Sequence, residues 1–169
     1  MTRRAAWNDA LDPWIQALAA REPTPAGGAL ALVTLAGSAA LAAKVIRIAG
    51  GDWPRGDVLA REFLEGADRD ARAYRAAAAA SESRRACLDL GLEQVGEGIR
   101  FLEGLAPWFD RLPEPLRADL AAAERLARAA CRTLLVNLAV NLDAWADDEA
   151  LGARVAGELA ALRARLEQA

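Results

Sequence analysis

Three polar side chains fall on helical faces that are otherwise apolar, and these are the residues with which this sequence could do chemistry. Asp70 shares one face with the apolar or small residues Leu59, Phe63, Ala67, Tyr74 and Ala77. A buried carboxylate is costly unless it is paired or hydrogen-bonded, and burial raises its pKa so that it can transfer protons. Asp70 therefore either meets a structural partner or serves a reactive site, and the pattern leaves both open.

The second and third polar residues are Asn137 and Asn141, four positions apart within the apolar run 134–142. Buried amides must find hydrogen-bond partners. They either bond across helices and fix the register or hold the polar edge of a ligand. Asp119 lies 18 residues before Asn137, so it points the same way but sits about 27 Å away along a helix axis. Asp119 also suits a first-turn acid that complements the helix dipole.

A proline–glycine stretch leads into the long uncharged part of the chain. Residues 23–29 read Pro-Thr-Pro-Ala-Gly-Gly-Ala, and a helix-forming segment without charge follows as far as Lys44. The free N–H groups of a helix N-terminus can bind an anion or a polar ligand, and glycine lets backbone come close to it. Pro25, Ala26, Gly27 and Gly28 are therefore candidate binding residues, although the same pattern also suits an ordinary tight loop.

The elements that would position these residues are helices. Ala, Leu, Arg and Glu dominate the 169 residues, aromatics are 5%, and β-branched runs are missing. The periodicity predicts six helices, near 8–20, 27–49, 55–80, 81–105, 115–145 and 147–167. Glycines at 96 and 98 predict a kink or a tight helix crossing, and prolines at 107, 113 and 115 predict a connection of about ten residues. We expect one all-α domain over residues 1–169, a helical bundle around a long Ala/Gly-rich central helix.

Composition narrows the function classes. A net charge of −3 gives no general attraction for nucleic acid, and the absence of histidine removes the commonest general base and metal ligand. Cys87 and Cys131 lack metal-site spacing and suit buried thiols in a reducing cytoplasm, so no metal is expected. Residues 23–43 carry no charge over 21 positions, but their hydrophobicity is poor for a membrane span. No membrane partner is therefore expected.

Four motifs in order resemble the cyclodeaminase/methenyltetrahydrofolate cyclohydrolase family, the domain also found at the C-terminus of formiminotransferase-cyclodeaminase. They are the Pro-x-Pro-glycine loop at 23–29 before an Ala-rich helix, Asp-Ala-Arg-Ala-Tyr at 70–74, Ala-Asp at 118–119, and Asn-Leu-Ala-Val-Asn-Leu at 137–142 followed by Asp147. The resemblance covers nearly the whole chain. It departs at Ala26, Ala29 and Ala118, where the family carries glycine or serine.

The resemblance implies an all-helical homodimer with a folate site near the glycine loop. The implied reaction is hydrolysis of methenyltetrahydrofolate or cyclisation of formiminotetrahydrofolate with ammonia release, with Asp70 and Asp119 as catalytic residues. Pro25, Ala26, Gly27, Gly28, Asn137 and Asn141 would bind the substrate, a tetrahydrofolate derivative, with no tightly bound cofactor. The three alanine departures favour an alternative, a catalytically degenerate member that acts as a folate-binding or protein-interaction scaffold.

Overall fold

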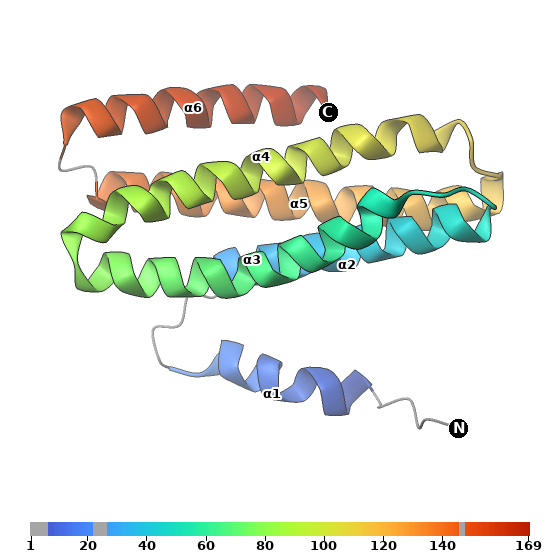
Figure 1. Ribbon diagram of the computed structural model, residues 1–169, viewed down its shortest axis with the longest axis horizontal. Helices are drawn as coiled ribbons and strands as arrows, with labels where there is room; N and C mark the ends of the chain where they lie inside the picture. The colour runs from blue at the N-terminus through green and yellow to red at the C-terminus, as the bar shows by residue number, and fades with distance from the viewer. Residues whose placement is uncertain (1–6, 22–26, 146–147) are drawn as a thin grey trace.

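The computed structural model describes residues 7–21, 27–145 and 148–169, and this part of the chain contains helices and turns but no strand. Figure 1 shows the arrangement. The elements are α1 (Trp7–Ala19), α2 (Gly27–Ile48), α3 (Pro54–Ala79), the 3₁₀ turn η1 (Ser81–Ser83), α4 (Arg84–Phe109), α5 (Glu114–Trp145) and α6 (Glu149–Gln168). The predicted all-α bundle around an Ala/Gly-rich helix is confirmed.

Helix α2 is the centre of the bundle. It packs along α3 on one side and along α5 on the other, while α4 packs on α3 and α5, and α6 covers α4 and α5. Leu32, Leu35 and Ile46 are almost completely buried, and so are the small residues Ala39 and Ala42. Among the described residues, α2 is the one helix long and apolar enough to cross a membrane, and half of its most apolar stretch is buried within the bundle.

Glycine permits the tight helix crossing predicted near residues 96–98. A Cβ atom built on Gly98 would lie 2.6 Å from the Sγ atom of Cys131 and 3.3 Å from a methyl carbon of Leu35. Real Cβ atoms essentially never come as close as 2.6 Å to another atom, so α4 can pass α5 at this distance only because residue 98 has no side chain. The crossing alternative of the prediction is confirmed.

The prediction for the middle of the chain was wrong in one respect. Helix α4 continues through Pro107 to Phe109, and only residues 110–113 separate it from α5. Pro107 lies in the last turn of α4. A proline there removes one backbone hydrogen bond, and because the helix ends two residues later, no further turn is disrupted. Leu112 is 2% exposed and seals the short connection, and Arg117 donates from Nε to the Leu112 carbonyl oxygen at 2.9 Å.

The last helix begins two residues later than predicted. Asp148 caps it by accepting hydrogen bonds from the backbone N–H groups of Ala150 and Leu151. Side-chain oxygens at this position satisfy donors that have no partner inside the helix.

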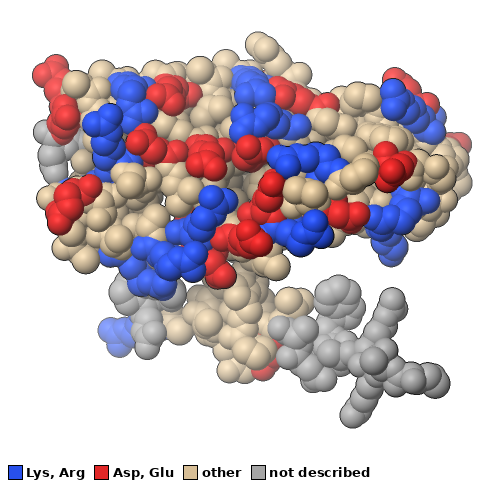
Figure 2. All heavy atoms as spheres, in the orientation of Figure 1, with Lys and Arg blue, Asp and Glu red and all other residues tan. Residues whose placement is uncertain are grey.

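Charged side chains cover the face that α3, α4 and α6 present in Figure 2. Arg165 pairs with Glu103 at 2.6 Å and Arg154 with Asp89 at 2.5 Å, so both pairs join α6 to α4. The face is densely charged but mixed in sign, which is typical of a solvated surface.

Candidate functional site

Two of the predicted polar residues, Asp70 and Asn137, meet at the first turn of α2. Helices α3 and α5 run on past the start of α2 and end at Ala79 and Trp145, and α4 begins at Arg84 at the same end of the bundle. The first N–H groups of a helix have no partner within it and carry a partial positive charge. This end therefore combines the N-terminus of α2 with side chains from three neighbouring helices.

The carboxyl group of Asp70 lies directly against the first turn of α2. A Cβ atom built on Gly28 would overlap Oδ2 of Asp70 and would lie 2.9 Å from both Cγ and Oδ1. Gly28 itself is buried, and its missing side chain is the space that the carboxyl group occupies. Burial raises the pKa of Asp70 above its usual value. The side chain is thus a half-buried acid that holds its proton more tightly than an exposed aspartate does.

Asn137 reaches the same turn of α2 from α5. A Cβ atom on Gly27 would lie 2.7 Å from Nδ2 and 3.1 Å from Oδ1 of Asn137. Two consecutive glycines therefore admit two polar side chains, one from α3 and one from α5. An amide offers both hydrogen-bond donors and an acceptor, so Asn137 can hold a ligand group that a carboxylate alone would repel.

Each of these side chains continues as a column toward the end of the bundle. Tyr74 lies one turn after Asp70 on α3, and Asn141 and Trp145 lie one and two turns after Asn137 on α5. The rings of Tyr74 and Trp145 contact each other, with centroids 5.4 Å apart and planes tilted by 43°. This aromatic pair joins α3 to α5, and aromatic faces of this kind can stack on a flat ligand.

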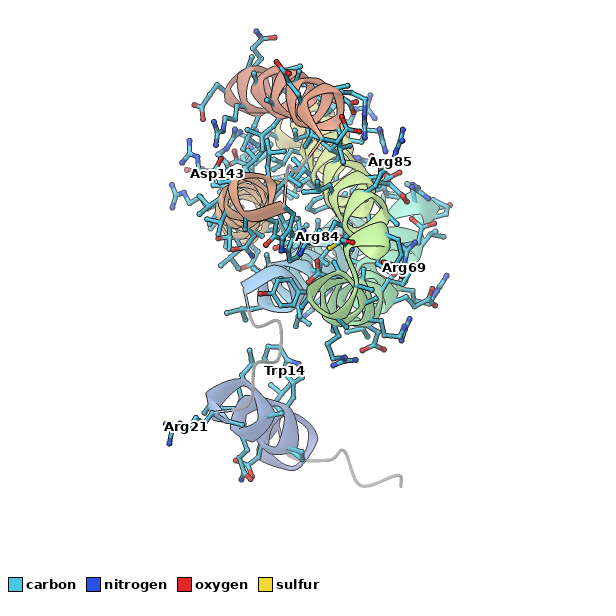
Figure 3. All side chains as sticks on the ribbon, turned by 90° about the vertical axis from the view of Figure 1, so that its left-hand side faces the viewer. Trp14, Arg21, Arg69, Arg84, Arg85 and Asp143 are labelled. Carbon is cyan, nitrogen blue, oxygen red and sulfur yellow. The ribbon has the colours of Figure 1, made fainter. Side chains whose placement is uncertain are left out.

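Helix α4 adds two residues that sequence reasoning did not assign to the site. The thiol of Cys87 is buried, and its pKa is raised to about 11, first by burial and then by the negative charge of Asp70. Cys87 therefore lies within electrostatic reach of Asp70. In Figure 3 Arg84 lies at the middle of the bundle end, between the ends of the surrounding helices. Arg84 and Cys87 lie one turn apart at the start of α4, and this spacing is the sequence signal that could have assigned them to the site.

The structure does not bring the other predicted residues to this place. Asp119 is exposed in the first turns of α5, at the opposite end of the bundle. Pro25 and Ala26 lie outside the described residues, as does Asp147. A separate pocket of about 250 Å³ lies between α3 and α4, where Gln94 donates from Nε2 to the Gly66 carbonyl oxygen at 3.1 Å. No group of three or more metal-binding side chains occurs among the described residues.

Comparison with known proteins gives a match among solved structures. No family model matches the sequence, and no curated protein does. Among solved structures, the crystal structure of formiminotetrahydrofolate cyclodeaminase from Thermotoga maritima superposes with a TM-score of 0.82 at 20% sequence identity. The match covers 98% of this chain and 91% of that one. This chain has the cyclodeaminase fold.

The fold similarity extends over nearly the whole chain. Because 98% of the chain is covered, the likeness includes the bundle end described above as well as the helices that support it. The cyclodeaminase fold agrees with the resemblance carried by the sequence motifs. The fold alone does not assign a reaction.

Proposed function

We propose that this chain is an enzyme of folate one-carbon metabolism that hydrolyses methenyltetrahydrofolate or cyclises formiminotetrahydrofolate with release of ammonia. The observation that carries the proposal is the carboxyl group of Asp70, half-buried against Gly28 at the start of α2 and opposite Asn137. The shared fold and the four sequence motifs in order support the same substrate class.

Both reactions need a group that gives a proton to one atom and takes one from another. In the cyclisation, a substrate nitrogen attacks the formimino carbon, a new C–N bond forms, and the old C–N bond breaks as ammonia leaves with a proton. In the hydrolysis, water adds to the methenyl carbon and loses a proton before one C–N bond opens. Asp70 suits this proton transfer because a raised pKa lets a carboxyl group act at less acidic pH.

The neighbouring groups suit the shape and polarity of a pterin. We propose that Asn137 and Asn141 hold its polar edge, that the Tyr74–Trp145 pair contacts its flat face, and that the N-terminus of α2 binds through N–H groups at Gly27 and Gly28. The proposed protein works as a cytoplasmic homodimer on a small-molecule folate and needs no tightly bound cofactor. We assign Asp119 no role in this site because it is exposed in the first turns of α5, at the opposite end of the bundle.

Replacement of the two candidate carboxylates tests the proposal directly. Asp70→Asn keeps the shape of the side chain but removes its acid, so turnover of the active substrate should fall by about 10²- to 10⁴-fold. Asp119→Asn is the matched control, the same substitution on an exposed carboxylate, and should leave turnover unchanged. Circular dichroism checks that both variants keep their helicity. Full activity in Asp70→Asn would refute the assigned role.

The alternative is a scaffold that keeps the fold without catalysis. It is favoured by Ala29, whose methyl group packs against the core at the place where the family carries a serine hydroxyl. Assays at enzyme concentrations near that of the substrate separate the two. Tight folate binding by calorimetry without turnover of either substrate would indicate a carrier or regulator, and no folate binding would indicate a structural role.

A further inference from the structure

Helix α1 exposes an apolar face that the rest of this chain does not cover. Leu11 and Ile15 are 44% and 52% exposed, and Trp14 and Leu18 lie on the same side of the helix. None of the described α1 residues belongs to the core or packs against it, and Figure 1 shows α1 lying apart from the bundle. A 13-residue helix is marginal in water on its own, so α1 needs a surface on which to pack.

A second uncovered apolar surface runs along α2 and α5. We call it the α2–α5 face; its large exposed residues are Leu30, Ile48, Leu126, Val136 and Val140. Gly37 lies on the same side of α2, and no atom lies within 4 Å of the place that a Cβ atom would take there. Of the two charged residues in α2, Arg47 is held by Asp57 of α3, which leaves Lys44. On α5, Arg132 is held by Glu167 of α6, and Arg125 and Asp143 are exposed beside the apolar residues. Protein interfaces are depleted of charge at their centre, so this face has the character of one.

The accessible surface of the chain is larger than that of a compact monomer. It measures 10033 Å², whereas a compact monomer of 17.9 kDa exposes about 8,000 Å² by the usual scaling with mass. The excess of about 2,000 Å² exceeds the roughly 800 Å² that each partner covers in a standard interface. The exposed α1 contributes to this excess, which is larger than the area that one partner covers in a standard dimer.

In this arrangement α1 does not cover the α2–α5 face of its own chain, whose large apolar residues are all between 46% and 61% exposed with α1 present. Seen along the bundle in Figure 3, α1 lies below α2 and α3, whereas the outer side of α5, marked by Asp143, points to the left. Trp14 lies on the side of α1 that faces the bundle. A twofold pairing would let each copy supply the surface that the other lacks.

We propose that α1 of each copy packs on the α2–α5 face of a second copy, so that two chains exchange their N-terminal helices. This inference deepens the homodimer proposed above and names its contact. It requires that α1 of one copy contacts the α2–α5 face of the other copy and not that of its own chain.

The test compares neighbouring positions on α1 in the full chain. Ile15→Glu places a charge on the apolar face, and Gln16→Glu adds the same charge to the polar side, where Gln16 donates to Asp12. By sedimentation, the wild type and Gln16→Glu should be dimers, and Ile15→Glu should dimerise on the order of 10- to 100-fold more weakly, as for loss of a central interface residue. A monomeric wild type, or an unchanged dimer in Ile15→Glu, overturns the proposal.

A mixing experiment separates exchange from packing within one chain. Val136→Glu should also weaken the dimer, because it places a charge on the α2–α5 face. A mixture of Ile15→Glu and Val136→Glu retains one intact helix–face contact, so heterodimers should form where neither variant self-associates. If the mixture forms no heterodimer, the exchange is refuted. It is also refuted if wild-type chains bind neutral phospholipid vesicles and do not form dimers. Folate turnover is measured on the same samples, so that loss of the dimer and lack of enzyme activity are recorded separately and each tests its own proposal.

Discussion

The close approach of Asp70 to Gly28 makes a sharp prediction about one added methyl group. In Gly28→Ala, the new Cβ atom would overlap Oδ2 of Asp70 and would lie 2.9 Å from Cγ. The backbone of α2 is held by α3 and α5 along its length, so the carboxyl group must move. The substitution therefore displaces the proposed catalytic group without removing it.

Two opposing effects set the magnitude for stability. Alanine in place of glycine inside a helix normally stabilises by roughly 0.5–1 kcal/mol. Overpacking a filled site costs typically about 1–3 kcal/mol. The clash should win, because the first turn of a helix gains least from propensity, and we expect a net loss of about 1–2 kcal/mol. At roughly 2–4 °C per kcal/mol for a chain of this size, Tm should fall by about 2–8 °C.

The effect on turnover should be larger than the effect on stability. A misplacement of a reacting group by about 1 Å costs on the order of 10²-fold in rate. The assay is steady-state turnover of methenyltetrahydrofolate or formiminotetrahydrofolate, measured beside a thermal melt. Gly157→Ala in α6 is the matched control, because open space surrounds its Cβ position, and it should raise Tm slightly and leave turnover unchanged.

A double-mutant cycle decides whether the clash is the cause. Asp70→Ala removes the carboxyl group, so adding Gly28→Ala in that background should cost nothing or stabilise slightly. The interaction free energy between the two positions should reach about 1–3 kcal/mol, as for groups in direct contact. If Gly28→Ala is instead as stable and as active as the wild type, Asp70 does not lie against α2 and the site is wrongly built.

Two further predictions follow from the raised pKa values. Burial raises the pKa of Asp70 above 3.8, so the native state binds this proton more tightly than the unfolded state, and stability falls as pH rises through the window above 3.8. Asp70→Asn should therefore raise Tm at neutral pH, with a gain that shrinks as pH falls toward 4; a constant gain in melts across pH would contradict this. Burial also raises the pKa of Cys87 to about 11 and of Cys131 to about 12, so both stay protonated at mildly alkaline pH. An aromatic disulfide reagent should react slowly with the native protein and fully in denaturant, and a fast native reaction would show that the thiols are accessible.

Helical periodicity was sufficient to predict the architecture because almost all the apolar surface lies on regular helices. Glycine and proline predicted most of the helix ends within a few residues, since they act locally on the backbone. Pro107 was misread because its effect depends on how much helix follows it. Only Trp108 and Phe109 follow Pro107 in α4, so the helix ends before the backbone hydrogen bonds of another turn are required.

The pairs that build the candidate site could not be predicted in the same way. Gly28 and Asp70 lie 42 residues apart in sequence, and Gly27 and Asn137 lie 110 apart. Periodicity says which face a residue occupies but not which residue of another helix stands opposite. The Tyr74–Trp145 contact was missed for this reason, because the register between α3 and α5 is set by α2 packed between them.

The two aspartates show what burial adds to a sequence pattern. Asp70 and Asp119 both lie at places where the resemblance puts an acid, and periodicity gave each of them an alternative structural explanation. The fold places Asp119 in water near the start of α5 and buries Asp70 between the glycine at the start of α2 and the thiol at the start of α4. An exposed carboxylate has no fixed surroundings, whereas a half-buried one has both a raised pKa and a defined neighbour. We therefore propose the proton-transfer role for Asp70 and not for Asp119, and in this proposal the glycine opposite Asp70 matters as much as the acid, because its missing side chain leaves the space that the carboxyl group occupies.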